Sequence, residues 1–291
     1  MSEVLRFDIK TISPEQTRKG LTRRIGELEV NQLLLVRNNN EDSEQPPNSA
    51  LLAVRPEYKE GRRDSVSGVW FADMTTDDTL ATQAVAIKPR LPPWLAAQEF
   101  RTANEINQSS QRQLTFQPIG FVRTKAGEER HGIITKFEED VKSFNNILHP
   151  GNGEKPDTAT VTSALGCAAE ALAILHGLGY EHGDYLLQNT ACDSKGRPRI
   201  IDITSAKKRK HPNDFRTDLE LYIGSLSRFG QIKPPATRKQ ITDYFLGPYR
   251  GEIPNIFSEQ EQRREILSII DCIAATIDRG GVLMTSHRGR R

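Results

Sequence analysis

The stretch Tyr180-Glu-His-Gly-Asp-Tyr-Leu-Leu-Gln-Asn189 is followed, after nine residues, by Arg199-Ile-Ile-Asp-Ile203. In the first segment an acid, Asp184, and an amide, Asn189, stand five positions apart in a loop-like sequence. A second acid, Asp202, comes thirteen residues after Asn189 and ends an apolar, strand-like run that follows a Lys-Gly hairpin turn. Asp and Asn also favour ordinary capped turns, so these residues are interpreted together with the segments around them.

A long helix is predicted to lead directly into this loop. Asp157 and Thr158 supply its start signal, and Gly177 and Gly179 end it. Between these ends, apolar residues recur at spacings of four and three positions and share one helical face: Val161, Leu165, Ala168, Leu172 and Leu175. Any amphipathic helix has this periodicity, but this helix continues without a break into the loop that carries Asp184.

The quoted residues, written as H-G-D-x-x-x-x-N and I-I-D, resemble the catalytic core of the protein-kinase-like superfamily. Val85-Ala-Ile-Lys88, which lies 96 residues before Asp184, is similar to the V-A-I-K of the third kinase strand. The resemblance extends from about residue 50 to about residue 230. It implies an α+β, two-lobed protein-kinase-like fold, with a small antiparallel-sheet N-lobe and a mainly helical C-lobe.

The resemblance also implies an ATP- and Mg²⁺-dependent phosphotransferase. Asp184 is expected to orient the attacking hydroxyl or accept its proton. Asn189 and Asp202 are expected to hold Mg²⁺, and Lys88 is expected to neutralise phosphate charge.

A glutamate on the helix expected from Trp94 to Gln108 should pair with Lys88 and hold it against the phosphates. Glu99 and Glu105 are both candidates. The sequence around Glu99 resembles that helix in several bacterial kinase-like proteins, whereas Glu105 has the more usual distance from Lys88. Glu99 is preferred, and the other glutamate is expected to be a surface carboxylate.

Further nucleotide contacts are implied by position alone. Glu138 falls where a hinge between lobes would bind adenine through its backbone. Ser67 and Gly68 fall in the turn that would cover the ATP phosphates, although no G-x-G-x-x-G is present and an ordinary hairpin loop fits as well. Asp218 is expected to brace the catalytic loop from a helix, with a plain capping role as the alternative.

Departures from the ordinary kinase pattern bear on the acceptor. Gly183 replaces the usual Arg, Ile203-Thr204 replaces Phe-Gly, and only sixteen residues separate Asp202 from Asp218. This shortened form looks like aminoglycoside and choline phosphotransferases, lipopolysaccharide kinases and small atypical kinases of the Bud-thirty-two type.

The acceptor itself is left open between two classes. The 46 residues from Glu138 to Asp184 leave no room for the helical insertion that builds the acceptor pocket of many antibiotic kinases. A protein Ser or Thr is therefore preferred over a small-molecule hydroxyl. A catalytically silent nucleotide-binding module, such as a pseudokinase or toxin–antitoxin partner, is the rival hypothesis.

Four regions are expected along the chain: an N-terminal extension (1–49) with a mobile loop at 38–48, an N-lobe (50–137), a C-lobe (138–285) and a disordered basic tail (286–291). Residues 4–12 alternate like a strand. Ser13-Pro14 is typical of a helix start, with Leu21, Ile25 and Leu28 on one face of the helix that would follow.

Composition excludes several classes of protein. The net charge of +2 does not indicate a nucleic-acid-binding surface, and three widely spaced cysteines do not indicate a disulfide framework or a metal site. No signal-peptide core or membrane-spanning run is expected, and a reducing cytoplasm is the natural location. The basic run Lys207–Lys210 is expected to be a solvated loop, with an acidic partner or nucleic acid as alternatives.

Overall fold

The computed structural model of the chain describes residues 4–8, 23–25, 28–35, 49–54, 69–76, 82–110, 112–126, 128–148, 156–209, 211–228, 237–249 and 260–280. The chain divides into two compact units. Unit 1 comprises Met1–Asn104 and Phe116–Glu138, and unit 2 comprises Glu105–Thr115 and Glu139–Arg291. Unit 1 contains an antiparallel sheet and unit 2 is mainly helical, so the α+β class predicted from the sequence is confirmed.

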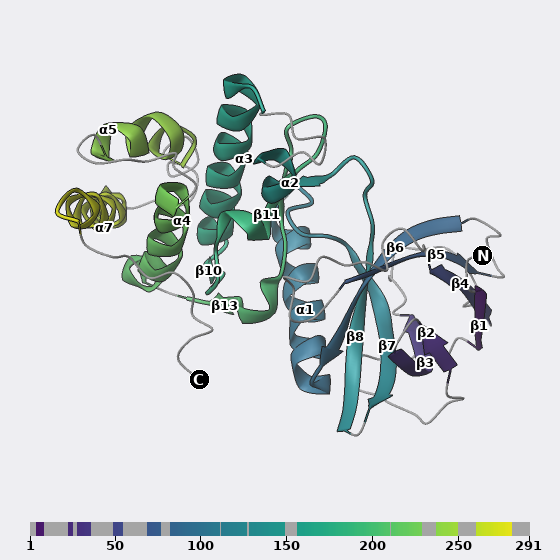
Figure 1. Cartoon of the computed structure of the whole chain (residues 1–291). Coiled ribbons are helices and arrows are strands. Elements are labelled where there is room, and N and C mark those ends of the chain that lie inside the picture. The colour runs from purple at the N-terminus through teal and green to yellow at the C-terminus, as the bar shows by residue number, and fades with distance from the viewer. Residues whose placement is uncertain are drawn as a thin grey trace. The chain divides into compact units, whose positions relative to one another are not determined.

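Among the described residues, unit 1 has one antiparallel sheet in the strand order β1-β4-β5-β6-β8-β7-β3-β2 (Figure 1). The strands are β1 (Val4–Asp8), β2 (Arg23–Ile25), β3 (Leu28–Leu35), β4 (Ser49–Val54), β5 (Trp70–Thr76), β6 (Thr82–Leu91), β7 (Pro118–Ala126) and β8 (Glu128–Lys136). In β6, Val85 and Ile87 are buried, which places Lys88 on the opposite face as the sequence predicted.

Strand β1 falls within the strand predicted at residues 4–12, whereas Ile25 and Leu28 differ from the sequence-based expectation. Ile25 ends β2 and Leu28 begins β3, so the predicted helical face through these residues is wrong. Strand β3 pairs with β7 along its length, and this pairing satisfies backbone polar groups in a way that three apolar residues at helical spacing do not reveal. Strands β1 to β3 thus belong to the same sheet as the strands after residue 49.

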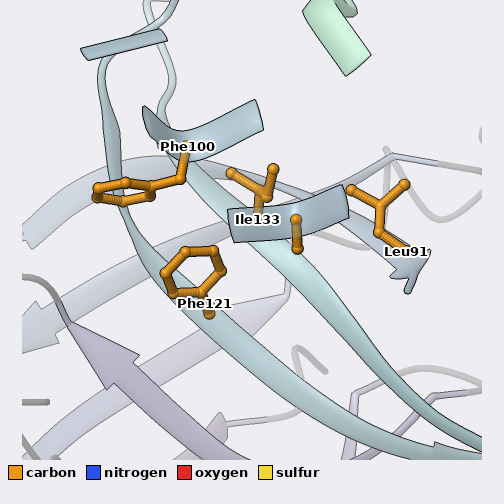
Figure 2. Packing of buried hydrophobic residues seen from close by; sticks show 5 residues of the cluster. Leu91, Phe100, Phe121 and Ile133 are labelled. Atoms are coloured by element: carbon orange, nitrogen blue, oxygen red, sulfur yellow. The ribbon is translucent and has the colours of Figure 1, made fainter. Parts of the chain in front are cut away.

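Helix α1 (Pro93–Ser109) packs on this sheet through the part of the helix that belongs to unit 1. The contact is a cluster of five buried apolar residues from α1, β6, β7 and β8: Ala96, Phe100, Leu91, Phe121 and Ile133. Figure 2 labels all of them except Ala96. The rings of Phe100 and Phe121 lie 4.9 Å apart between centroids. Burying each large side chain contributes roughly 1.5–3 kcal/mol, so this cluster fixes the part of α1 that carries Glu99.

The helices of unit 2 are α2 (Phe144–Leu148), α3 (Thr158–Gly177), α4 (Arg216–Arg228), α5 (Thr237–Ile241), which continues as the π-helix η5 (Thr242–Leu246), and α7 (Gln260–Asp278). Figure 1 shows α3, α4 and α7 in the part of the chain coloured from teal to yellow. The core of unit 2 includes four buried isoleucines of α7: Ile266, Ile269, Ile270 and Ile273.

Helix α3 corrects one expectation about hydropathy. By length and composition alone, it is the one helix among the described residues that could cross a membrane. Its mean hydropathy is 1.5 over an 18-residue window, and 50% of that window is buried in the structure. The prediction that no run reaches this level is therefore wrong. Small and apolar core residues, such as Ala168, Ala169 and Leu172, raise the hydropathy as lipid-facing residues would.

Short elements frame the loop that follows α3. They are β9 (Lys142–Ser143), β10 (Tyr180–Glu181), η2 (Leu187–Asn189), β11 (Thr190–Cys192), β12 (Pro198–Ile200), η3 (Ile203–Ser205), β13 (Lys207–Lys208) and η4 (Pro212–Phe215). Strand β11 pairs with β12 and β9, and β10 pairs with β13. Gly196 has a φ of 73° in the predicted hairpin turn between β11 and β12.

Several sequence-based predictions fall outside the described residues. They concern Ser67 and Gly68 in the proposed phosphate turn, the loop at 38–48, the helix start at Ser13, Lys210 and the tail from residue 286. These stay predictions.

Candidate functional site

Helix α3 delivers the chain to the loop that carries Asp184. Asp157 caps its first turn by accepting a hydrogen bond from Thr160 N at 2.8 Å, which confirms the predicted helix start. At the other end Gly179 has a φ of 76°, a backbone conformation that favours glycine. The chain then enters β10 and the loop that ends with the short helix η2.

Asp184 and Asn189 are in direct contact. The Asn189 side-chain nitrogen donates to the Asp184 carbonyl oxygen at 2.8 Å and lies 3.4 Å from the Asp184 Oδ2. Because the side-chain amide of Asn189 is planar and its nitrogen faces Asp184, the amide oxygen points away from Asp184. Asp184 is only 8% exposed, so its carboxylate is held in a restricted environment.

His182 supports this loop from within. Its Nδ1 accepts a hydrogen bond from Asp184 N, at 3.2 Å, and its Nε2 donates to the Ile201 carbonyl, also at 3.2 Å. These partners require the proton to be on Nε2, since a backbone N–H can only donate. His182 is completely buried, and through these two hydrogen bonds it supports the loop.

Asp218 of α4 braces the same loop. Its carboxylate accepts hydrogen bonds from His182 N at 2.6 Å and Gly183 N at 2.8 Å. It also accepts one from Nε2 of His176, on α3, at 3.1 Å. Asp218 and His176 are buried, so three converging donors compensate the cost of removing this carboxylate from water. The predicted bracing contact is present in the structure.

Tyr249 completes the network behind Asp218. Its hydroxyl lies 2.9 Å from Nδ1 of His176. Burial, together with the negative charge of Asp218, raises the pKa of Tyr249, so the phenol keeps its proton at neutral pH. The network links α3, α4 and Tyr249, three residues after η5, to one loop.

Gly183 explains one departure from the ordinary kinase sequence. It has a φ of 80°, and a Cβ at this position would lie 3.1 Å from the Ser205 carbonyl oxygen. A larger residue in the usual Arg position would therefore strain the backbone and displace the segment after Asp202.

Asp202 is held next to the loop through its neighbour. Ile201 N donates to the Asn189 carbonyl at 2.8 Å, and the Ile201 carbonyl accepts from His182. Asp202 itself has a φ of 56° and is the only non-glycine residue with positive φ among the described ranges. Such a conformation costs of the order of 1 kcal/mol and is often retained at functional sites. Its Oδ1 accepts a hydrogen bond from Thr204 Oγ1 at 2.7 Å.

Lys88 and Glu99 form an ion pair in unit 1. The Lys88 Nζ lies 3.2 Å from each carboxylate oxygen of Glu99, and both side chains are largely buried. Glu105 accepts a hydrogen bond from Tyr180 O–H and lies 3.3 Å from Lys208 Nζ. Of the two glutamates left open by the sequence, Glu99 is the one that forms an ion pair with Lys88 in the structure, as preferred.

Part of the basic run is neutralised within unit 2. Lys208 pairs with Glu105 and lies 5.3 Å from the ring centroid of Tyr180. Arg209 pairs with Glu181 at 2.6 Å, and this contact raises the pKa of Arg209. Both side chains keep substantial exposure, and the alternatives of an acidic partner or nucleic acid stay predictions.

Glu138 is the last residue of unit 1 before the chain continues in unit 2, and its expected adenine contact stays a prediction. Just before it, Phe137 N donates to the Ala84 carbonyl at 2.9 Å, and the ring of Phe137 packs against Phe71 at 4.7 Å between centroids. The backbone at the end of β8 is thus anchored to the sheet of unit 1.

The oxygen atoms of Asp202 and Asn189 suit a hard divalent cation. Within the described ranges, no three His, Cys, Asp or Glu side chains form a group that could hold a metal. Mg²⁺ in phosphoryl-transfer sites uses few protein ligands, together with phosphate oxygens and water. Among the described residues, the types of donor therefore suit Mg²⁺, and they do not form a complete protein cage.

Sequence reasoning missed His176, Tyr249 and Thr204. His176 lies in an apolar helix face, Tyr249 is more than 60 residues beyond the loop, and Thr204 was noted only as a departure from glycine. A polar residue within the otherwise apolar end of α3 was the one available signal for His176.

Comparison with known proteins gives little further guidance. No family model matches the sequence, and no curated protein matches it. A solved structure described as "WaaP in complex with acyl carrier protein" matches with 17% identity over 73% of this chain and 86% of that chain, at a TM-score of 0.45. A match of this identity and TM-score is too weak to assign the chain to a family or an activity.

Proposed function

We propose that this chain is an ATP- and Mg²⁺-dependent phosphotransferase with a protein-kinase-like fold, and that it transfers the γ-phosphate to a hydroxyl. The observation that carries the proposal is the braced loop. Asp184 and Asn189 touch each other, Asp218 holds the loop through two backbone N–H groups, and Ile201 ties the neighbouring Asp202 to it. Such fixed polar groups suit phosphoryl transfer, which depends on positioning and on electrostatic stabilisation.

Each residue has a proposed role. Asp184 orients the acceptor hydroxyl and takes its proton as the oxygen bonds to the γ-phosphorus and the bond to the β-phosphate breaks, releasing ADP. Asn189 and Asp202 would hold Mg²⁺ through oxygen atoms, and the cation would supply positive charge for the phosphate oxygens. Lys88 contributes positive charge to the phosphates, and Glu99 fixes the direction of the Lys88 side chain.

A protein Ser or Thr is the proposed acceptor, and a small-molecule hydroxyl is the alternative. The support for the protein acceptor is the short connection between Glu138 and the loop, in which α2 has five residues and α3 leads directly to the loop. Incubation of the full chain with radiolabelled ATP, a panel of proteins and a panel of amino alcohols distinguishes these acceptors. Label found only in small molecules would contradict the protein acceptor.

The role of the ion pair is tested by two matched glutamate variants of α1. Glu99→Gln removes the carboxylate bound to Lys88, and we expect kcat/KM for ATP to fall roughly 10- to 100-fold. Glu105→Gln changes a carboxylate that binds Lys208 and Tyr180 instead, so kcat/KM should change by less than about 3-fold. Equal losses in both variants would contradict the proposed role of Glu99.

Asp202→Ala and Asp184→Ala separate catalysis from binding. We expect both to abolish turnover, and only Asp202→Ala to abolish the Mg²⁺-dependent part of nucleotide binding, measured by calorimetry with a non-hydrolysable ATP analogue. A wild-type chain that binds the analogue but transfers no phosphate to any acceptor or to water would instead favour a silent nucleotide-binding module.

A further inference from the structure

Thr204 makes a contact that the proposed roles do not use. Its hydroxyl donates a hydrogen bond to Oδ1 of Asp202 at 2.7 Å. The two side chains are two positions apart, and both residues are partly buried. Thr204 also stands where the ordinary kinase sequence has glycine, which has no side chain to make such a contact.

The backbone around Asp202 is fixed on both sides. Ile201 is bonded through its N–H and its carbonyl, and the turn of η3 is closed by a hydrogen bond from Ala206 N to the Ile203 carbonyl at 3.0 Å. Asp202 lies between them in the left-handed conformation. With the main chain fixed, the remaining freedom of Asp202 is rotation of its side chain.

The Thr204 hydroxyl restricts that rotation. A carboxylate is planar, so a hydrogen bond that fixes Oδ1 also fixes the direction in which Oδ2 points. Hydrogen bonds to metal-binding carboxylates orient the ligand, and their loss typically lowers metal affinity or activity by 10- to 100-fold.

We propose that Thr204 is a positioning residue that orients the Asp202 carboxylate for a divalent cation. The inference rests on the proposed function, because it assumes that Asp202 binds the cation that accompanies the nucleotide. Thr204 touches neither nucleotide nor acceptor in this proposal, and acts only through Asp202.

A set of three variants tests the role of the hydroxyl. Thr204→Val keeps the branched shape and removes the hydroxyl, and Thr204→Ser keeps the hydroxyl and removes the methyl group. Ser205→Ala removes the adjacent, exposed hydroxyl and is the matched control. Because Val and Thr differ mainly in the hydroxyl, the first two variants separate hydrogen bonding from packing.

The main measurement is binding of a non-hydrolysable ATP analogue by calorimetry at increasing Mg²⁺ concentration, with the full chain. We expect Thr204→Val to need roughly 10-fold more Mg²⁺ for half-maximal enhancement of binding. Thr204→Ser and Ser205→Ala should stay within about 3-fold of the wild type. Binding of the analogue without Mg²⁺ and the urea midpoint of unfolding should be alike in all four proteins.

Three results would overturn the inference, and they can be told apart. If the wild type shows Mg²⁺-dependent binding and Thr204→Val shows the same Mg²⁺ dependence, Thr204 does not position Asp202 and the proposed function stands. If Mg²⁺ does not enhance binding of the analogue to the wild type, the proposed function and the role of Thr204 both fail. A loss of Mg²⁺ response in Thr204→Ser equal to that in Thr204→Val would also reject the hydroxyl's role.

Discussion

Replacing Asp218 is expected to destabilise the helical unit strongly. In Asp218→Ala, three donors lose their acceptor: His182 N, Gly183 N and His176 Nε2, at 2.6, 2.8 and 3.1 Å in the wild type. Each hydrogen bond to a charged group contributes about 1.5–3 kcal/mol, and these contributions overlap. Removing one partner of a buried charged network typically costs 3–5 kcal/mol, so we expect a loss of about 4 kcal/mol.

Asp218→Asn should give a smaller, graded effect. Oδ2 of Asp218 accepts two of the three hydrogen bonds, so the Asn oxygen should occupy that position. The Asn nitrogen would then face the N–H of Gly183, which replaces one hydrogen bond with two opposed donors. We expect a loss of about 1–3 kcal/mol for this variant.

Urea unfolding followed by two probes measures both losses. Both tryptophans, Trp70 and Trp94, belong to unit 1, so their fluorescence reports on that unit. Far-ultraviolet circular dichroism reports mainly on the helices of unit 2. The variants should lower the midpoint of the circular dichroism transition, in the order Asp218→Ala below Asp218→Asn below wild type.

A surface carboxylate on α7 serves as the control. Asp271 pairs with Arg238 at 3.2 Å, and both side chains are substantially exposed, so Asp271→Ala should cost less than about 1 kcal/mol. If Asp218→Ala unfolds at the same urea concentration as Asp271→Ala, Asp218 does not brace the loop, and the account of the site given above is wrong.

Three further predictions concern the loop, the cysteines and the hairpin. In urea unfolding, Gly183→Ala should lower the free energy of unfolding by about 1–3 kcal/mol more than Gly196→Ala does. Both glycines have positive φ, but only at Gly183 would a Cβ meet another backbone segment. Equal losses in the two variants would exclude the clash. In a mass-spectrometric time course, iodoacetamide should label the exposed Cys272 first and Cys167 last. The reason is that the hydrogen bond with the Cys192 thiol, together with burial, raises the pKa of Cys167. Early labelling of Cys167 would contradict its burial. Burial acts to raise the pKa of Asp193, but hydrogen bonds from the hairpin turn outweigh burial and lower this pKa. The ionised carboxylate therefore stabilises the fold above the pKa of Asp in the unfolded chain, near pH 4, and this stabilisation is lost as the pH falls below that value. Stability should therefore depend less on pH below about 4 in Asp193→Asn than in the wild type, and parallel pH profiles in thermal unfolding would refute this.

Local sequence signals were sufficient for much of the chain. The spacing of Leu165, Leu172 and Leu175 predicted α3 because helix periodicity and caps are properties of neighbouring residues. Lys195-Gly196 predicted the hairpin for the same reason, since a turn depends on the backbone preferences of a few residues. The polar residues Asp184, Asn189 and Asp202 were singled out by the resemblance of their motif to kinase-like proteins. The structure brings Asp184 and Asn189 into contact and ties the backbone next to Asp202 to Asn189.

Contacts between distant segments could be fixed only by the tertiary structure. The sequence alone left Glu99 and Glu105 as alternatives, and packing of Phe100 against the sheet decided that Glu99 binds Lys88. Ile25 and Leu28 have a spacing that also fits a helix, and pairing of β2 with β3 and of β3 with β7 places them in strands. The network of His176, Asp218 and Tyr249 joins residues up to 73 positions apart in the chain, and no local pattern encodes it. Burial assembles these groups, because a carboxylate removed from water is stable only where the fold supplies its donors.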